Sequence, residues 1–283
     1  MQSSLESLEG RRLFSTFALD GKILTVTGTS GDDVIVVDIG GDGGFNGFYW
    51  VDGDTWVQAS VNGAIKRFDV DDVQGVVANG LSGADKLSAS FVSVTLIGGG
   101  GNDSIFGSDG GDLLRGDEGN DEISAGAGNN AVSGGPGDDL IYGGDDNDRI
   151  DGGDGADRIQ GSAGRDFISG GPGNDTITGN AGADRIDGGA GDDRLNGSGS
   201  NDYLSGAEGN DRVYGNAGND HLEGGGGVDR LFGGDGADVL VGGGSNDKLY
   251  GEAGADTLYG GMGDDRRDND PLDISTDVEG IIT

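Results

Sequence analysis

The stretch GGPGNDTIT at residues 170–178 is followed by GNAGADRID at 179–187 and GGAGDDRLN at 188–196. Each stretch opens on glycine, has an acid at its sixth place and has one large aliphatic residue at its eighth place. Nonapeptides of this kind follow one another without an insertion from Gly98 to Asp268, which makes nineteen copies. A period this strict predicts a solenoid, in which each repeat packs only against its neighbours.

The composition indicates that the solenoid needs a cation in order to fold. The chain has 283 residues, of which 65 are glycine, and its 52 acids against 17 bases give a net charge of −35. Glycine loses much backbone freedom on folding, and like charges repel one another in a compact state. Nucleic acid is therefore a poor partner, and the absence of cysteine excludes disulfides and thiolate metal sites. No apolar run approaches the ~20 residues that span a bilayer.

The places within the repeat predict its local structure. Glycines at places one, two and four favour a tight turn with positive φ, and the last three residues, such as 176–178, favour a short strand with its middle side chain pointing inward. One turn and one strand make half a coil, so two nonapeptides make one full coil. Turns that are two repeats apart then stack on one edge of an all-β fold, about 4.8 Å apart.

Stacked sixth-place carboxylates have two interpretations. Aspartate often caps a turn, and a single repeat would not need another explanation. Carboxylates repeated at the spacing of a sheet, however, repel one another unless a cation lies between them. Carboxylate and carbonyl oxygens suit Ca²⁺, whereas zinc favours His or Cys, and the chain has one His and no Cys. The repetition in register favours calcium.

With these residues in view, GGPGNDTIT resembles the GGxGxDxUx nonapeptide of the RTX, or haemolysin-type calcium-binding, repeat family, and the resemblance covers about three-fifths of the chain. It implies a parallel β-roll solenoid that holds Ca²⁺ between turns n and n+2. It also implies that sixth-place aspartates are the side-chain ligands, beside carbonyls of the glycine turns. The leading hypothesis is a secreted or surface protein, extracellular or on the cell surface, that folds on binding up to about seventeen calcium ions.

The implied ligands form two stacks. The first comprises Asp103, Asp121, Asp139, Asp157, Asp175, Asp193, Asp211, Asp229, Asp247 and Asp265, with Asp85 in phase before them. The second comprises Asp112, Asp148, Asp166, Asp184, Asp202, Asp220, Asp238 and Asp256, and it is interrupted by Asn130. The interrupted repeat, AGAGNNAVS at 125–133, also begins with Ala125 in place of glycine. A positive φ at Ala125 would strain its Cβ, so we expect this repeat to be the weakest.

The remaining segments suggest four regions. Residues 1–21 are interpreted as a disordered leader or tag, 22–97 as a small β-rich cap with two repeat-like turns at 28–36 and 80–88, 98–268 as the roll, and 269–283 as a C-terminal capping tail. Trp50, Trp56 and Phe68 would form either a sugar-binding face or the core of the cap, and the cap is favoured because solenoid ends need covering.

Other functions have to be weighed against calcium binding. Tyr214, Phe232 and Tyr250 recur at every second repeat among basic residues, and they would form either a stacking stripe for a glycan or a structural row. The alternative function is thus a calcium-dependent adhesion or glycan-binding module. Some rolls of this family bind ice, but the third places here show no row of Thr. An enzyme is not expected, because the one histidine, His221, lies within the repeats and no nucleophile elbow accompanies it.

Overall fold

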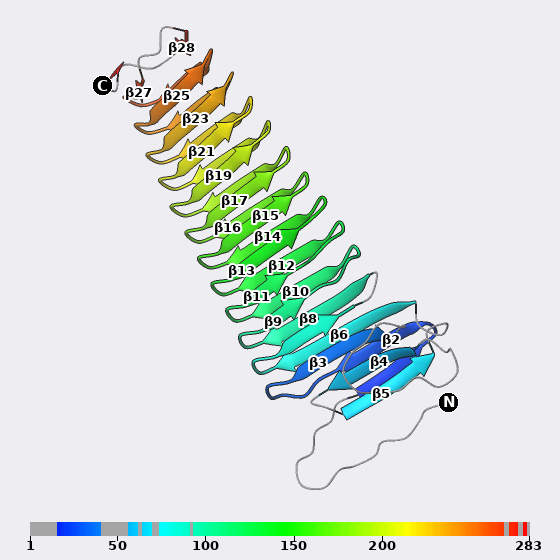
Figure 1. Ribbon diagram of the computed structural model, residues 1–283. Coiled ribbons are helices and arrows are strands. Elements are labelled where there is room, and N and C mark those ends of the chain that lie inside the picture. The colour runs from blue at the N-terminus through cyan, green and yellow to red at the C-terminus, as the bar shows by residue number, and fades with distance from the viewer. Residues whose placement is uncertain are drawn as a thin grey trace.

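The computed structural model describes residues 16–40, 56–61, 64–69, 74–90, 93–268, 272–276 and 280–281. The chain winds into coils whose strands stack side by side, from β1–β5 at one end to β27–β29 at the other (Figure 1). Two facing sheets result, and successive strands of the roll alternate between them. The expectation of an all-β parallel solenoid is confirmed.

The 14-stranded sheet contains, in spatial order, β1 (Thr16–Asp20), β2 (Ile23–Thr27), β6 (Gly75–Ser82), β8 (Val94–Gly100), β10 (Leu113–Glu118), β12 (Ala131–Pro136), β14 (Arg149–Asp154), β16 (Phe167–Pro172), β18 (Arg185–Ala190), β20 (Tyr203–Glu208), β22 (His221–Gly226), β24 (Val239–Gly244), β26 (Thr257–Met262) and β28 (Ile274–Thr276). The turns that lead into this sheet form what we call the second edge.

The 15-stranded sheet contains, in spatial order, β5 (Ala64–Asp69), β4 (Trp56–Val61), β3 (Val34–Gly40), β7 (Lys86–Ala89), β9 (Ser104–Phe106), β11 (Glu122–Ser124), β13 (Leu140–Gly144), β15 (Arg158–Ala163), β17 (Thr176–Ala181), β19 (Arg194–Gly199), β21 (Arg212–Ala217), β23 (Arg230–Gly236), β25 (Lys248–Gly254), β27 (Arg266–Arg267) and β29 (Gly280–Ile281). The turns that lead into this sheet form the first edge.

The core is a double row of eighth-place aliphatic side chains between the sheets. Ile177 and Leu195 are fully buried from one sheet, and Ile186 and Leu204 from the other. Pairing keeps a register of two repeats, so that Ile177 lies opposite Leu195. Most strands are six residues long rather than the expected three, because the first three residues of the next repeat continue the strand. A Cβ at the first-place glycine would therefore point into the roll, next to the sixth-place side chain of the same repeat.

Positive φ occurs at the second and fourth places of the repeat, and not at the first. Gly171 and Gly173 have φ of 105° and 149°, and Asn180 shows that the second place also holds non-glycine residues, at 76°. The expected turn is therefore confirmed at two of its three glycines, and the first-place glycine has a different physical reason.

The N-terminal region belongs to the same two sheets as the roll. β2 pairs with β6 and β3 pairs with β7, both in parallel, so residues 23–37 form a coil in front of the one that contains β6 and β7. The antiparallel pair β4–β5 extends the 15-stranded sheet beyond β3. Residues 16–20 of the expected leader form β1, which pairs with β2. Residues 1–15 and 41–55, including Trp50, and the side chains of Trp56 and Phe68 lie outside what the structure describes.

At the other end the roll continues beyond the last nonapeptide. β28 pairs with β26 so that Ile274 lies opposite Thr257, and β29 pairs with β27. The amide of Asp256 donates to Oδ1 of Asp273 at 3.2 Å, which places Asp273 in the second-edge stack after a step of 17 residues. The expected capping tail therefore supplies strands to both sheets.

Candidate metal centre

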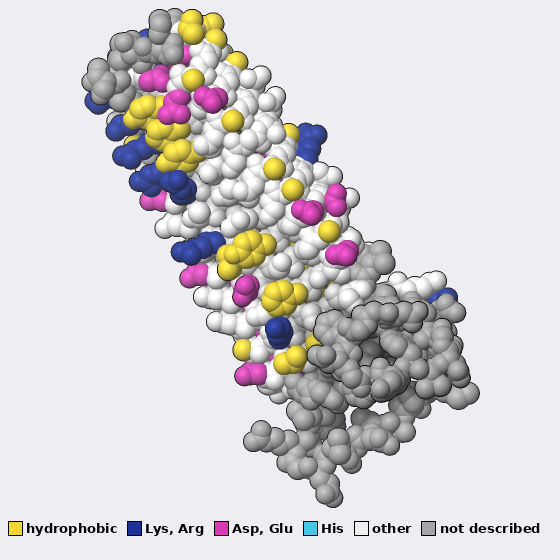
Figure 2. Space-filling model, in the orientation of Figure 1, with side chains coloured by type: hydrophobic (Ala, Val, Ile, Leu, Met, Phe, Trp, Pro, Cys, Tyr) yellow, Lys and Arg dark blue, Asp and Glu magenta, His cyan; other side chains and the backbone are white. Residues whose placement is uncertain are grey.

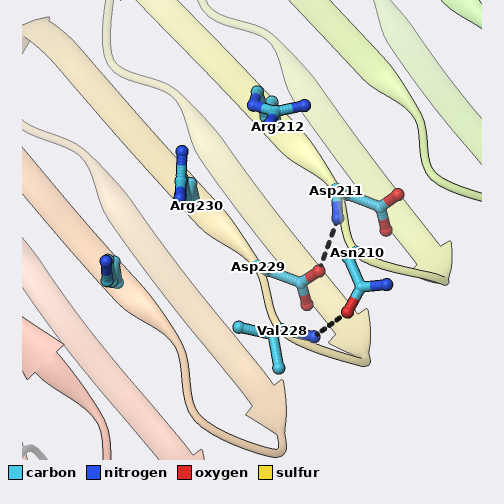
Figure 3. Close-up of a pocket in the computed structure, with 7 residues that line it drawn as sticks. Asn210, Asp211, Arg212, Val228, Asp229 and Arg230 are labelled. Atoms are coloured by element: carbon cyan, nitrogen blue, oxygen red, sulfur yellow. Dashed lines mark hydrogen bonds between the residues drawn. The ribbon is translucent and has the colours of Figure 1, made fainter.

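The sixth-place aspartates form two continuous ladders, one along each edge. Each side chain reaches back to the preceding coil, where its Oδ1 accepts a hydrogen bond from the backbone amide at the equivalent place, which in most coils belongs to the aspartate two repeats earlier. The bond from Asp211 to Asp229 is 2.8 Å long (Figure 3), as is the bond from Asp148 to Asp166. All sixth-place side chains are at most 4% exposed. The ladders hold every carboxylate in one orientation, with Oδ1 used by the backbone.

The second oxygen, Oδ2, is buried and has no hydrogen-bond partner along almost the whole length of both ladders. This holds for Asp85, Asp103, Asp121, Asp139, Asp157, Asp175, Asp193, Asp211, Asp229, Asp247 and Asp265 on the first edge, and for Asp148, Asp166, Asp184, Asp202, Asp220 and Asp238 on the second. A buried acceptor without a donor costs about 1–3 kcal/mol, and more when it is charged. Repeating that cost at every coil indicates a missing positive partner.

Backbone carbonyl oxygens lie beside these Oδ2 atoms. A Cβ on Gly143 would lie 2.6 Å from Oδ2 of Asp148 and 2.7 Å from the carbonyl oxygen of Gly161 in the next coil. The same carboxylate-and-carbonyl pair surrounds Gly224, with Asp229 and Gly242. Glycine at the first place thus leaves an oxygen-lined space that a methyl group would fill. Within the described residues no three His, Cys, Asp or Glu side chains converge, so a cation there would draw on carbonyls as well as carboxylates.

Burial makes these carboxylates hard to ionise. The pKa values of Asp139, Asp148, Asp193 and Asp202 are raised to about 7, first by desolvation on burial and also by neighbouring carboxylates of the same ladder. The hydrogen bond from the preceding coil's amide lowers the pKa but does not outweigh burial. The pKa values of Asp85, Asp103, Asp157, Asp166, Asp175, Asp211, Asp229, Asp238 and Asp247 rise to about 6 for the same first cause. Oxygen donors with this much excess negative charge fit a hard divalent cation.

Two turns differ, because a hydroxyl residue at the second place satisfies the carboxylate. The amide of Ser108 donates to Oδ2 of Asp112 at 2.6 Å, and its hydroxyl lies 3.1 Å from the same atom. Thr29 does the same for Asp33, with its amide at 2.5 Å and its hydroxyl at 3.0 Å. Positive φ is found neither at these second places nor at Gly31 and Gly110. Asp112, a predicted ligand, therefore differs from the other members of its stack.

The repeat that contains Ala125 and Asn130 keeps the ladder but changes its chemistry. The backbone amide of Asp112 donates to Oδ1 of Asn130 at 2.9 Å, and the backbone amide of Asn130 in turn donates to Oδ1 of Asp148. Nδ2 of Asn130 is buried without a partner. Ala125 is fully buried and its φ is not positive, so the predicted backbone strain is wrong. Its methyl group instead lies at the place where the other repeats leave the oxygen-lined space.

A different kind of ladder, which the sequence analysis missed, is formed by side chains at the fifth places. Oδ1 of Asn174 accepts the amide of Asp192 at 2.8 Å, and Oδ1 of Asn210 accepts the amide of Val228 at 3.0 Å (Figure 3). These side chains reach forward to the next coil, whereas the sixth-place side chains reach back. The frequent Asn or Asp at the fifth place was the signal available in the sequence.

The outward residues singled out in the sequence are in contact with one another. Tyr214, Phe232 and Tyr250 stack with ring centroids 4.8 and 4.6 Å apart. His221 stacks on Tyr203 at 4.9 Å, and its Nε2 lies 2.9 Å from Oε1 of Glu223. The histidine is thus half-buried.

The comparisons with known proteins agree with this geometry. The model of the RTX calcium-binding nonapeptide repeat matches overlapping segments from 79–114 to 232–266, which together span residues 79–266. The chain belongs to the family of proteins with RTX calcium-binding nonapeptide repeats. This repeat is a structural calcium-binding type, so the chain is a calcium-binding β-roll. No curated protein matches the chain.

One crystal structure with a similar fold is that of a hyperactive, Ca²⁺-dependent, β-helical antifreeze protein from an Antarctic bacterium. The TM-score is 0.55 and the sequence identity is 24%, over 73% of this chain and 74% of that chain. At this identity the likeness shows the fold alone.

Proposed function

We propose that the roll of this chain folds when its sixth-place aspartates bind Ca²⁺, and that the protein acts outside the cell or on its surface. The observation that carries the proposal is the row of buried Oδ2 atoms without hydrogen-bond donors, which is unbroken from Asp85 to Asp265 on the first edge. Extracellular calcium sites commonly have a Kd of about 10⁻⁴–10⁻³ M. Such sites fill outside the cell and stay empty at cytosolic calcium, so binding would favour the folded state only after export.

A Ser or Thr at the second place that bonds to Oδ2 of the aspartate is called a hydroxyl cap. The proposed ligands are the sixth-place aspartates that lack this cap, together with carbonyl oxygens of the first-place glycines. Asp256 is included by its place in the second-edge ladder, and Asp112 is left out because Ser108 satisfies it. A bound calcium ion would supply the positive charge that these oxygens lack. The second edge then offers sites only from Asp148 onward, so the number of ions is smaller than the seventeen expected from the repeats.

The proposal includes no catalytic step. His221, the one histidine of the sequence, is held between the ring of Tyr203 and the carboxylate of Glu223. Nowhere in the described part of the chain is there a helix with the length and hydropathy to cross a bilayer. Ice binding is not proposed either, because the likeness to the antifreeze protein concerns the fold and the third places of this chain lack a regular row of Thr.

The test is a calcium titration followed by far-ultraviolet circular dichroism, with magnesium as the control ion. We expect little β-structure in chelator and a β-rich spectrum at about 1 mM calcium. An identical spectrum in chelator and in calcium would contradict the proposal.

Two matched variants locate the sites within the roll. Asp166→Asn removes a carboxylate whose Oδ2 has no donor, so it should lower the number of bound calcium ions measured by equilibrium dialysis. Asp112→Asn removes a carboxylate already satisfied by Ser108, so it should leave that number unchanged. Equal losses in the two variants would show that the hydroxyl cap does not decide which turns bind calcium.

A calcium-dependent adhesion or glycan-binding module is the second candidate function. It is favoured by a row of basic side chains on the outer face of the 15-stranded sheet.

A further inference from the structure

The outer face of the 15-stranded sheet carries a straight row of five cations, which we call the basic column: Arg194, Arg212, Arg230, Lys248 and Arg266. They lie on β19, β21, β23, β25 and β27, and each pairs in register with the next. Basic and hydrophobic side chains form two adjoining rows at this end of the roll in Figure 2. The chain has only 17 bases, so placing five of them in one line is a strong concentration of positive charge.

This arrangement is unfavourable for the isolated roll. Like charges directly opposite one another on neighbouring strands destabilise a sheet. Among the described residues, no carboxylate lies within ion-pair distance of any member of the basic column. Asp211 and Asp229 are adjacent in sequence to Arg212 and Arg230, but their side chains point into the first edge (Figure 3), where each accepts a hydrogen bond from a backbone amide of the preceding coil. The repulsion is therefore not relieved by direct ion pairs with acids of the described part of the roll.

The neighbouring aromatic row is structural and bounds one side of the basic column. Tyr214 and Tyr250 cover the two faces of Phe232, with interplanar angles of 5° and 3°. The guanidinium group of Arg194 covers the free face of Tyr214, 4.6 Å from the ring centroid. With these faces occupied, the row presents mainly ring edges, so it offers little for stacking by a nucleic-acid base or a sugar. Recognition at this surface therefore rests on charge.

We propose that the basic column binds a linear acidic polysaccharide that carries a carboxylate on each sugar. Cations at the strand spacing repeat about every 4.8 Å, which is close to the advance per ring of an extended 1,4-linked sugar chain. A linear chain can follow the column without touching the acidic remainder of the molecule. An anionic membrane would face that remainder as well, and it would be repelled by it. The inference rests on the proposed function, because the column exists only in the folded roll.

The test measures binding of short oligogalacturonates to the full-length protein in calcium, with dextran oligosaccharides of equal length as the neutral control. The column variant is Arg212→Gln, Arg230→Gln and Lys248→Gln, which keeps side-chain length and removes three charges. The control variant is Arg149→Gln, Arg165→Gln and Arg185→Gln, which removes three exposed charges from the 14-stranded sheet and its turns, outside the column. Circular dichroism of the same samples reports folding separately from binding.

We expect the column variant to bind at least about tenfold more weakly, the control variant to bind like the parent, and added salt to weaken binding. We also expect the column variant to be at least as stable as the parent, because its in-register repulsion is relieved. Equal affinity of the two variants, equal binding of dextran, or binding to phosphatidylglycerol vesicles in place of the oligogalacturonate would overturn the inference. A parent protein that folds in calcium but binds no oligogalacturonate would overturn the inference alone. A parent that stays unfolded in calcium would overturn the proposed function.

Discussion

The first-place glycine is the residue on which the candidate calcium sites depend most. Its φ is not positive, so conformational freedom does not explain it. Gly143 is needed because a side chain there would take up the space between Oδ2 of Asp148 and the carbonyl oxygen of Gly161. The glycine and the sixth-place aspartate of the same repeat thus form one functional pair.

Gly143→Ala should fill that space and remove one or two calcium ions from the second edge. The calcium-loaded roll should lose about 1–3 kcal/mol of unfolding free energy, as for overpacking at a buried position. The matched control is Gly199→Ala, because a Cβ on Gly199 meets nothing within 4 Å and its φ is not positive. Calorimetric titration and thermal unfolding in calcium check both variants. Equal calcium binding by the two variants would contradict the role assigned to the first place.

Some residue roles were predictable from the sequence and others were not. The shared environment of the sixth-place aspartates was predictable, because a period of nine assigns every one of them the same position in its coil. The cap at Ser108 could not be predicted, because Ser162 and Ser198 occupy the same place of the repeat and have φ of 86° and 82° instead. The amide of the second-place residue reaches the carboxylate only where its φ is not positive. The identity of that residue alone does not determine the sign of φ.

At the scale of elements, the second edge begins with two coils that differ from all later ones. Asp112 is satisfied by Ser108, and Asn130 is uncharged and lies beside the methyl group of Ala125. The ladder of hydrogen bonds nevertheless passes through both coils. These turns therefore hold their shape with neutral or already satisfied groups, whereas the coils from Asp148 onward are those for which we propose a bound cation.

The double variant Ala125→Gly with Asn130→Asp should convert the second of these coils into a calcium-binding one. Asn130→Asp alone should destabilise the roll by about 1–3 kcal/mol, because the new buried carboxylate has no donor and the methyl group occupies the space beside it. With Ala125→Gly added, equilibrium dialysis should show additional bound calcium. Limited proteolysis across residues 116–142 should then shift to lower calcium. If Asn130→Asp alone binds the additional calcium, the methyl group is not the obstacle.

The strands and the fifth-place ladder show where reasoning from one repeat falls short. The expected three-residue strands are six residues long because the next repeat's first places also pair, as in β17 with β19. The fifth-place bonds, such as that from Asp192 to Asn174, join separate coils. Both features arise only when coils are stacked, so a single nonapeptide does not reveal them.

At the scale of the whole molecule, charge decides which conditions the roll tolerates. The net charge is −35, and the buried part of it lies in two rows of carboxylates whose pKa values are raised. Folding without calcium must therefore either bury charge or take up protons. Under the proposed function, calcium and protons would compete for the same oxygens.

The calcium-free protein should consequently be more folded in acid than at neutral pH. Folded-state pKa values near 6 to 7 exceed the ordinary value of 3.8, so the folded state binds more protons than the unfolded state between these limits. Its stability is then greatest below about pH 4 and is lost as the pH rises through about 6 to 7. Circular dichroism in calcium-free buffer should show more β-structure at about pH 5 than at about pH 7.5. The calcium concentration at half-folding should fall as the pH falls, because proton binding to the same carboxylates already favours the folded state. A calcium-free spectrum that loses β-structure on acidification would contradict this account.

The overall architecture was predictable where the period holds and not where it stops. Nineteen copies in phase allow one arrangement of coils, and the structure has it. The coil formed by β2 and β3 was missed because 52 residues, rather than two repeats, separate Asp33 from Asp85, whose Oδ1 accepts the amide of Asp33. The coil that contains Asp273 was missed because its step is one residue short. Strand pairing between segments distant in sequence therefore determines the first and the last coil of the solenoid.

The alternation of successive strands between two sheets has a consequence for how such a chain can change its length. Insertion or loss of two nonapeptides adds or removes a whole coil and leaves every outward residue on its own face. Loss of one nonapeptide between Arg212 and Arg230 would keep every core position filled, yet it would move Arg230, Lys248 and Arg266 to the opposite face. The sequence has a period of one nonapeptide, but each outer face of the roll has a period of two. Duplication in the gene can therefore lengthen the roll by any number of repeats, whereas only an even number keeps the residues of a binding face on the same side.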